Sequence, residues 1–367
     1  MGIKSLLKNE GINVVRELNT KEVKTIAKDI AIKLCLAFPE HNLSRTDLYE
    51  ALSKVKMHFA NLPKDFSGAK YILENNSIYF NNDLAFEDIP NTAMHECIHF
   101  IQHFNSNSNF GLCSSVKDLA LNEAAVQLMA SEANMNEEIE VKYFDISLKT
   151  NTPDYYPLEC ALLNQITYFT GTYPLYNSVL FSNDIFKNTF TIQFNKKFYS
   201  FITKKLDDLL YLEDELNSYA EELSYANNER TIKNLNKIIN NRKQKITNLF
   251  FQTQNRIMEM CFNYEFNKTK TLEDIHEFKN KLYEFKNRIG YNDNYTFYNN
   301  FYCSMMNVIE NKKEYIKEHG PLSLPSEEST ALMVIDTKKN KMAFAKTFFR
   351  KLKQLFNTEV SRDYINE

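Results

Sequence analysis

Glycine and tryptophan are scarce in this chain of 367 residues, which contains 7 glycines and no tryptophan. It holds no glycine-rich phosphate-binding loop, no internal repeat and no motif for a protein nucleophile. Its six cysteines include no C-x-x-C pair and lack the density of a disulfide scaffold, so we expect reduced thiols in a cytosol. The cysteines are Cys35, Cys97, Cys113, Cys160, Cys261 and Cys303.

Long hydrophobic runs are also absent, since no stretch approaches the ~18 apolar residues that span a bilayer. The first residues, MGIKSLLKNEGINVV, do not form the apolar segment of a signal peptide, because Lys8 and Glu10 interrupt it. Leu6 occupies the position at which a myristoylation signal needs Ser or Thr. The sequence thus predicts a cytoplasmic protein without a membrane span.

Charge of one sign does not dominate the composition. The formal net charge is −3, so no overall basic field indicates a nucleic-acid partner. The length and the 43% hydrophobic content suffice for a sizeable core. The oligomeric state is left open by these observations.

One stretch, Asn91–Phe104, carries a metal-binding pattern. It reads NTAMHECIHFIQHF and contains an H-E-x-x-H sequence from His95 to His99. Residues four apart lie on the same face of a helix, so the two imidazoles can bind one zinc ion while Glu96 acts on a zinc-bound water. A random chain of this composition would hold roughly 0.02 such matches, so the pattern is informative.

This pattern needs a helix with the histidines on its polar face, and the neighbouring residues predict one. His95 and His99 fall opposite an apolar arc, with Glu96 at its edge. Asp88 is expected to cap the helix, and Pro90 to occupy its first turn. The apolar arc consists of Met94, Cys97, Ile98, Ile101 and Phe104. A cysteine on that arc is expected in the core and not on the metal.

Catalytic zinc usually has three protein ligands and one open position, and Glu123 is the best candidate for the third ligand. It follows His99 by 24 positions, in a second helical stretch, DLALNEAAVQLMASEA. Small side chains on or near the same face would let this helix approach the first one closely. These side chains are Ala120, Ala124 and Ala130.

Two alternatives to Glu123 fail on spacing. His103 extends the histidine stripe but lies two turns from His95, so it cannot share the metal and is expected only to line the cleft. The metzincin pattern needs a Gly and a His where Gln102 and Asn105 stand, so that class is excluded.

These residues resemble the gluzincin metallopeptidases, the thermolysin-like group, whose third ligand is a Glu on a following helix, often preceded by Asn. Asn122-Glu123 matches that pair. Where those enzymes carry an Asp four residues after the Glu, this chain has Gln127, whose amide oxygen could orient a ligand histidine but would raise its basicity less. The resemblance covers about residues 70–180 and looks most like uncharacterised HExxH proteins of firmicute bacteria. It implies a zincin-like core, bound zinc and peptide hydrolysis.

The resemblance also implies an oxyanion donor. Hydrolysis of a peptide passes through an oxyanion, and zinc is usually assisted by a Tyr or His donor. Related HExxH proteins often show a Tyr before the helix that follows the third ligand. The turn-rich break Pro153–Pro157 contains Tyr155 and Tyr156, either of which could be this donor. A packed aromatic side chain is the alternative for both.

Upstream of the motif, the sequence predicts a small sheet. Ala69–Leu73 and Ser77–Asn81 are expected to form a hairpin around Asn75-Asn76. By resemblance to zincins, Ile78–Phe80 is expected to edge the cleft and to pair with extended substrate. An ordinary hairpin that covers the helix is the alternative.

Most of the remaining chain is predicted to be helical. The two long runs have apolar residues at three-to-four spacing, which favours an intramolecular hairpin over a partner-binding coiled coil, although Arg242 interrupts the second run. The predicted helices are Thr20–Ala37, Ser44–Ala60, Leu158–Phe169, the long runs Leu206–Leu223 and Ile232–Leu249, Thr271–Arg288, Asn299–Glu318 and Met342–Phe356. A strand or irregular segment is expected at Glu138–Ile146, and a strand at Thr330–Thr337. Surface or capping positions are expected for His41, His58, His276 and His319.

The fold class that follows is α+β and predominantly helical, with a small sheet before the HExxH helix. We expect a zincin-like catalytic region over residues 1–200 and a helical region with a long hairpin over residues 201–320. A C-terminal strand and amphipathic helix are expected over residues 321–367.

The function that follows is that of a zinc-dependent metallopeptidase acting on a peptide or protein substrate. His95, His99 and Glu123 are the expected zinc ligands, and Glu96 is the expected general base. The alternative is a regulatory or protein-binding protein that keeps a zincin fold without proteolysis. The presence of Glu96 favours catalysis, because a purely structural zinc site more often closes its fourth position with Cys or His.

Overall fold

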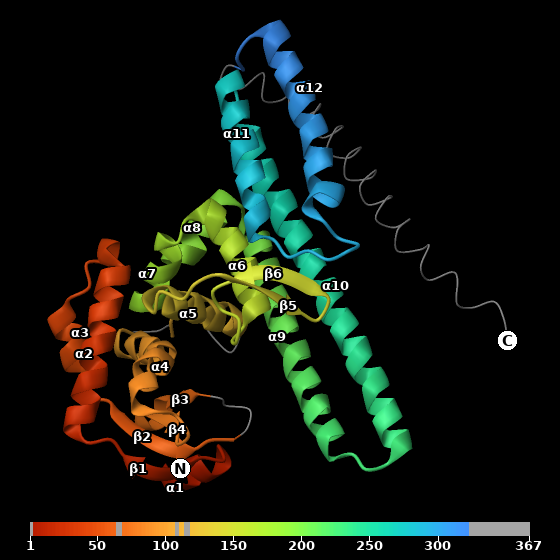
Figure 1. Cartoon of the computed structure of the whole chain (residues 1–367). Coiled ribbons are helices and arrows are strands. Elements are labelled where there is room, and N and C mark those ends of the chain that lie inside the picture. The colour runs from red at the N-terminus through yellow and green to blue at the C-terminus, as the bar shows by residue number, and fades with distance from the viewer. Residues whose placement is uncertain (1–2, 64–67, 107–109, 114–117, 323–367) are drawn as a thin grey trace. The chain divides into compact units, whose positions relative to one another are not determined.

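The computed structural model describes residues 3–63, 68–106, 110–113 and 118–322 (Figure 1). Within these residues the fold is α+β and predominantly helical, as predicted. The described residues divide into two compact units, one formed by the residues up to Thr269 with His276–Ile309, the other by Lys270–Ile275 with residues 310–322. The division into three regions at residues 200 and 320 stays a prediction.

The helices and strands follow one another in three groups along the chain. The first group is α1 (Ile3–Asn9), β1 (Asn13–Glu17), α2 (Thr20–Ala37), α3 (Arg45–Leu52), β2 (Lys56–Asn61), β3 (Ala69–Ile72), β4 (Ser77–Asn81) and α4 (Ile89–Phe104). The second is α5 (Leu119–Ala133), β5 (Ile139–Tyr143), β6 (Ile146–Thr150), α6 (Pro157–Thr170), α7 (Tyr173–Phe181) and α8 (Ile185–Gln193). The third is α9 (Lys196–Tyr225), α10 (Glu229–Lys268), α11 (Leu272–Phe285) and α12 (Cys303–His319).

A four-stranded mixed sheet precedes the HExxH helix, in the order β1-β2-β4-β3. β2 and β4 are parallel, and the two outer pairs are antiparallel. The predicted hairpin β3–β4 is confirmed, with Asn76 in the left-handed conformation at its turn. The expectation that Ile78–Phe80 edges the cleft was wrong, because β4 lies inside the sheet and β3 is the edge strand beside it. The four consecutive residues Ser77–Phe80 are all buried, which is typical of a strand in the interior of a sheet.

The predicted helix Ser44–Ala60 is only half correct. Ser44 caps α3 as expected, since its hydroxyl accepts a hydrogen bond from the backbone N–H of Asp47 at 3.2 Å. The helix ends at Leu52, and the following residues form β2. Pairing with both β1 and β4 decides this structure, because Met57 and Phe59 then point into the core on alternate positions. These partners are distant in sequence, so a local pattern could not reveal them.

Helix α2 packs against α3, α4 and α5 through a continuous apolar face. Its predicted bounds are confirmed. A capping box begins the helix: the side chain of Asn19 accepts from the backbone N–H of Glu22, and the Glu22 carboxylate accepts from the backbone N–H of Asn19. The HExxH helix, α4, contacts strands β3 and β4 of the sheet, and it also packs against α2 and α5.

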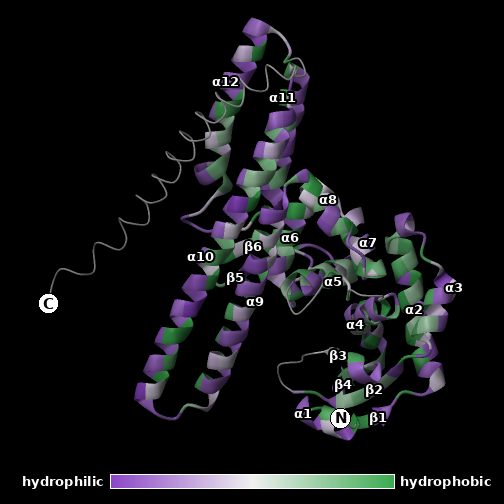
Figure 2. Ribbon diagram, turned by 180° about the vertical axis from the view of Figure 1, so that it is seen from behind, coloured by the Kyte–Doolittle hydropathy of each residue, from purple (hydrophilic) through white to green (hydrophobic). Residues whose placement is uncertain are grey.

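Helices α9 and α10 form the predicted intramolecular hairpin, along which hydrophobic and hydrophilic residues alternate (Figure 2). Leu209 and Leu216 of α9, and Ile239 and Ile246 of α10, are buried. Arg242, which interrupts the apolar run, forms an ion pair with Glu215 of α9 at 3.3 Å. A charged residue in the seam is thus accommodated by a partner on the facing helix. Helix α6, predicted at Leu158–Phe169, is also confirmed.

Two histidines expected at the surface are partly or fully buried. His41 is 5% exposed and stacks on Tyr173, with ring centroids 4.7 Å apart. His58 lies in β2, the strand that was read as helix, and stacks on Tyr79. Burial lowers the pKa of both imidazoles. These expectations were wrong because the contacts come from distant parts of the chain. The other two, His276 and His319, are exposed as expected.

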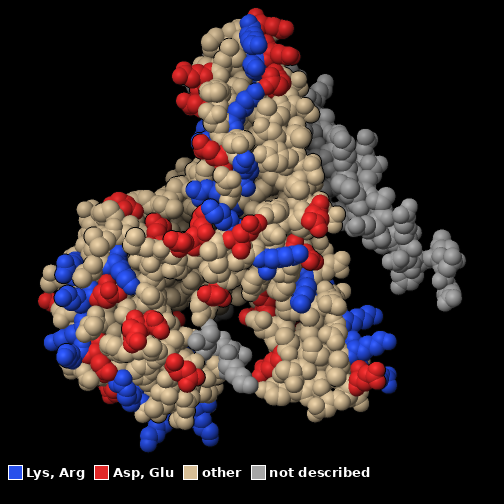
Figure 3. Space-filling model, in the orientation of Figure 1, with Lys and Arg blue, Asp and Glu red and all other residues tan. Residues whose placement is uncertain are grey.

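Further predictions concern charge, membranes and the C-terminal residues. Acidic and basic side chains are interspersed over the face shown in Figure 3. Among the described residues, no helix combines the length and the apolar character needed to cross a bilayer.

The stretch Glu138–Ile146 contains β5 and the start of β6, which form an antiparallel hairpin. The strand Thr330–Thr337 and the helix Met342–Phe356 lie outside the described residues.

Candidate metal centre

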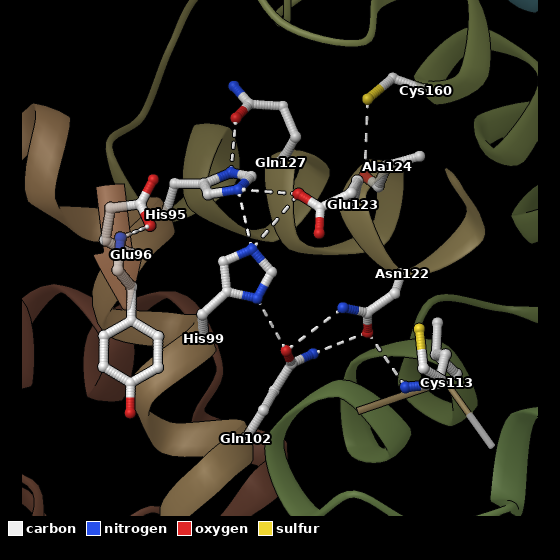
Figure 4. Close-up of polar contacts among 12 residues, drawn as sticks. His95, Glu96, His99, Gln102, Cys113, Asn122, Glu123, Ala124, Gln127 and Cys160 are labelled. Carbon is white, nitrogen blue, oxygen red and sulfur yellow. Dashed lines mark hydrogen bonds and ion pairs between the residues drawn. The ribbon is translucent and has the colours of Figure 1, made fainter. Parts of the chain in front are cut away.

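Helices α4 and α5 bring three potential metal ligands together: His95 and His99 come from α4, and Glu123 from α5 (Figure 4). The small residues predicted to allow this approach are buried, and α5 packs against α4. They are Ala120, Ala124 and Ala130. The arrangement follows from the sequence, because alanines on α5 leave room for its backbone to come close to α4.

The three ligand atoms have the separations that a tetrahedral zinc site requires. The Nε2 atoms of His95 and His99 are 3.0 Å apart, and each lies 3.3 Å from Oε2 of Glu123. Zinc–ligand bonds of about 2.0–2.1 Å at tetrahedral angles place the ligand atoms about 3.3 Å from one another. The donor set of two imidazoles and one carboxylate is also one that zinc accepts. Geometry and chemistry thus both fit a zinc ion.

His95 is oriented by Gln127, as the sequence suggested. The Nδ1 atom of His95 lies 2.9 Å from Oε1 of Gln127. The other side of this amide, Nε2, donates to the hydroxyl of Ser131 at 3.3 Å. Because an amide oxygen can only accept a hydrogen bond, Nδ1 of His95 must carry the proton. The unprotonated Nε2 of His95 then faces Glu123.

His99 is oriented by Gln102, a residue whose role the sequence analysis missed. Its Oε1 atom lies 2.9 Å from Nδ1 of His99. Gln102 also pairs with Asn122, since its Nε2 donates to Oδ1 of Asn122 at 2.9 Å. The signal was present, because Gln102 stands three positions after His99 on the histidine arc of the same helix.

The electrostatics of the site reflect the close approach of opposite charges. Burial alone would lower the pKa of His99, but the charges of Glu123 and Glu96 and the hydrogen bonds to Glu123 and Gln102 raise it to about 9. Burial would raise the pKa of Glu123, but His99 and His95 hold it well below its ordinary value. The same carboxylate that would bind a cation therefore helps to hold a proton on His99.

The histidine face of α4 is covered at His99 and Gln102 and partly exposed at His95. His99 is 7% exposed and Gln102 is fully buried, because α5 and the segment Phe110–Cys113 pack over them. The ring of Phe110 stacks on His99 with centroids 5.8 Å apart. The side chains of His95 and Glu123 each keep 16% of their surface exposed. Solvent therefore reaches the ligand set on the His95 side.

Two further details of α4 differ from the prediction. Asp88 precedes the helix, but its side chain makes no capping hydrogen bond, and Phe104 in the last turn is exposed. Cys97 is fully buried in the core and is not near the ligand atoms, as expected. None of the six cysteines, all of which lie in the described residues, forms a disulfide.

Glu96 is held by the edge strand of the sheet. Its Oε2 atom accepts a hydrogen bond from the backbone N–H of Tyr71 in β3 at 2.7 Å. The Tyr71 hydroxyl lies 2.8 Å from Nδ1 of His103, which is outside the ligand set as predicted. The negative charge of Glu96 contributes to the raised pKa of both His99 and Tyr156.

The two candidate tyrosines occupy different places. The ring of Tyr156 lies 6.3 Å from that of His95 in a stacked arrangement, and its hydroxyl interacts with the carboxylate of Glu123. Tyr155 is exposed, and its hydroxyl approaches Gly68 at the start of β3. Tyr156 adopts a left-handed conformation before α6, which turns its side chain toward the ligands. Of the two, Tyr156 is the one beside the ligand set.

Comparisons with known proteins do not extend this picture. No family model, no curated protein and no solved structure was found to match the chain. The case for the site therefore rests on its own residues: a group formed by His95, His99 and Glu123 whose ligand atoms all lie within 4.8 Å of one another.

Proposed function

We propose that the protein is a zinc-dependent metallopeptidase of the gluzincin type. The observation that carries this proposal is the convergence of His95, His99 and Glu123 at zinc-like separations, with Glu96 beside them on the same helix. A bound zinc ion supplies a Lewis acid that lowers the pKa of a coordinated water to about 7. The oriented imidazoles and the carboxylate would hold that ion.

Glu96 acts as the general base in this proposal. Its carboxylate removes a proton from the attacking water and then passes the proton to the leaving amine. The hydrogen bond from the backbone N–H of Tyr71 fixes one oxygen of the carboxylate, so the other oxygen is presented in a defined position. A glutamate at this place that is not a ligand supports a catalytic site, because a purely structural zinc site more often closes its fourth position with Cys or His.

Tyr156 donates a hydrogen bond to the oxyanion. Burial and the charges of Glu123, Glu96 and Glu159 raise the pKa of this phenol above its ordinary value. The hydroxyl therefore keeps its proton at neutral pH and can stabilise negative charge that develops on the substrate carbonyl oxygen. Tyr155 is the weaker candidate, because its hydroxyl approaches the start of β3.

The substrate we propose is an extended peptide that pairs with β3. The backbone N–H of Asn81 donates to the carbonyl of Gly68 at 2.9 Å, so alternate residues of β3 bond to β4. Ala69 and Tyr71 then direct their N–H and C=O groups away from β4, as the contact from Tyr71 to Glu96 illustrates. The Tyr71 N–H is already taken by Glu96, so a strand added at this edge would pair beside that contact and bring its scissile bond next to the general base.

The direct test is elemental analysis of purified protein, paired with cleavage of a peptide library. We expect one equivalent of zinc and cleavage that a chelator abolishes and added zinc restores. A protein that binds zinc in this stoichiometry but cleaves no peptide would support the alternative of a non-proteolytic zincin fold. A protein that takes up no zinc at all would contradict the proposal.

Replacing Tyr156 with Phe should lower kcat by roughly 10²–10³-fold, the effect of removing one oxyanion donor. KM and zinc content should change little, because the ring that stacks near His95 is retained. The measurement is steady-state kinetics on a cleaved peptide, with Tyr155→Phe as the matched control. Equal losses in the two variants would speak against Tyr156 as the donor.

A further inference from the structure

A chain of hydrogen bonds runs from a loop backbone to one of the candidate ligands. We propose that Gln102 is a positioning residue that fixes the tautomer of His99, and that the segment Phe110–Cys113 sets its orientation. The segment would thereby control the metal affinity of the site. This inference rests on the proposed metal site and concerns residues that lie outside the ligand set.

The direction of each hydrogen bond in this chain follows from its first donor. The backbone N–H of Leu112 can only donate, and it lies 3.0 Å from Oδ1 of Asn122. The Asn122 amide is thereby fixed with its oxygen toward Leu112, and the same oxygen accepts from Nε2 of Gln102 at 2.9 Å. The second amide is then fixed as well, with its Oε1 directed toward His99.

An amide oxygen can only accept, so Nδ1 of His99 must carry the proton in the hydrogen bond to Gln102. Its Nε2 atom, which faces Glu123 and His95, is then the nitrogen left for a metal. Asn122 supports this arrangement through a second contact, since its Nδ2 donates to Oε1 of Gln102 at 3.3 Å. The tautomer of His99 is thus dictated by a backbone N–H two side chains away.

Gly111 allows the loop to approach this closely. A Cβ atom at position 111 would lie 2.1 Å from Nε2 of Gln102 and 2.3 Å from Oδ1 of Asn122, and the residue has φ +56°. Ser182 binds both partners, because its hydroxyl accepts from the backbone N–H of Gly111 at 3.0 Å and donates to the carbonyl of Gln102 at 2.8 Å. The segment is therefore fixed to the helix that carries the ligands.

Among the residues that the structure describes, His95 has no equivalent connection to a backbone donor. The amide of its partner Gln127 is held by the hydroxyl of Ser131, which can act as donor or acceptor. The loop therefore acts selectively on His99, the more buried of the two imidazoles. Since Gln102 and Asn122 are both neutral, the effect is one of orientation and not of added charge.

The test measures zinc dissociation constants of the full chain by competition with a chromophoric chelator at fixed pH. Gln102→Leu removes the acceptor and should weaken zinc binding by ~10–100-fold. Gln102→Glu keeps an oxygen that accepts from Nδ1 of His99 and should therefore bind zinc more tightly than Gln102→Leu. Nitrogen-15 NMR of the zinc-loaded protein should show a proton on Nδ1 of His99 in the wild type and in Gln102→Glu.

A second pair of variants tests the loop itself. Gly111→Ala should weaken zinc binding to a similar extent as Gln102→Leu. Gly171→Ala is the matched control, because Gly171 also has a positive φ, +78°, and its nearest neighbour for a new Cβ is 3.9 Å away. Both variants are compared after circular dichroism has shown the same helical content as the wild type.

The outcomes separate this inference from the proposed function. If folded Gln102→Leu binds zinc as tightly as the wild type, the inference is overturned but the proposed function is not. The same holds if Gly111→Ala and Gly171→Ala change the zinc affinity equally. Weakened binding in Gln102→Glu equal to that in Gln102→Leu would also overturn it, because the acceptor would then not matter. A wild-type chain that binds no zinc would overturn the proposed function and this inference with it.

Discussion

Glu96→Gln is expected to lose peptide hydrolysis while it keeps its zinc. A carboxamide cannot take a proton from water, and loss of a general base typically lowers the rate by about 10²–10⁴-fold. The metal should remain, because Glu96 does not belong to the ligand group of His95, His99 and Glu123. The local structure should also remain, since the new amide oxygen can still accept from the backbone N–H of Tyr71.

The measurement combines zinc analysis with cleavage kinetics on the same preparation. Glu87→Gln is a suitable control, because Glu87 is an exposed glutamate just before α4. It should leave both zinc content and hydrolysis unchanged. Hydrolysis that persists in Glu96→Gln at the wild-type rate would rule out Glu96 as the general base.

The ligand set could be predicted because it depends on residue spacing within two short stretches of sequence. Spacing by four fixes His95 and His99 on one face of any helix, and the alanines around Glu123 favour close packing of the second helix. Gln127 could be assigned for the same reason, since it lies one helical turn after Glu123. Short-range periodicity was therefore sufficient to predict that these side chains would meet.

The sheet could not be predicted to the same extent, because strand pairing depends on distant partners. The local pattern of Ser44–Ala60 predicts a helix where β2 forms. Without β2, the second neighbour of β4 is missing, and Ile78–Phe80 is wrongly expected at the edge of the sheet. The backbone contact from Tyr71 to Glu96 was hidden in the same way. Backbone donors carry no residue signature, so which strand lies at an edge cannot be read from local composition.

The support around His99 was missed for another reason. Gln102 and Asn122 are ordinary polar residues in the sequence. They stand 20 positions apart and are brought together only by the fold. The backbone of Gly111 completes the network from a loop. Networks of neutral amides have no characteristic spacing, in contrast to an H-E-x-x-H sequence. Their detection required the positions of both helices and of the loop.

Glu123→Ala should cause the largest loss of zinc affinity among the variants considered. It removes one of three ligand atoms, so the effect should exceed the ~10–100-fold typical of a partner outside the ligand set. Glu132→Ala is the matched control on the same helix, because the Glu132 carboxylate accepts from the hydroxyl of Tyr176 and lies outside the ligand group. Zinc binding that is equal in the two variants would exclude Glu123 as a ligand.

The same substitution should change how zinc binding depends on pH. Before zinc binds, Glu123 helps to raise the pKa of His99 to about 9, so this imidazole carries a proton at neutral pH that zinc must displace. Wild-type affinity should therefore rise with pH, by up to about tenfold per unit, as the pH approaches 9. In Glu123→Ala the larger of the two charges that raise the pKa of His99 is gone while burial still lowers it, so this slope should become smaller above neutral pH. Dissociation constants measured from pH 7 to 9 test this, and an unchanged slope in the variant would show that another group holds the proton.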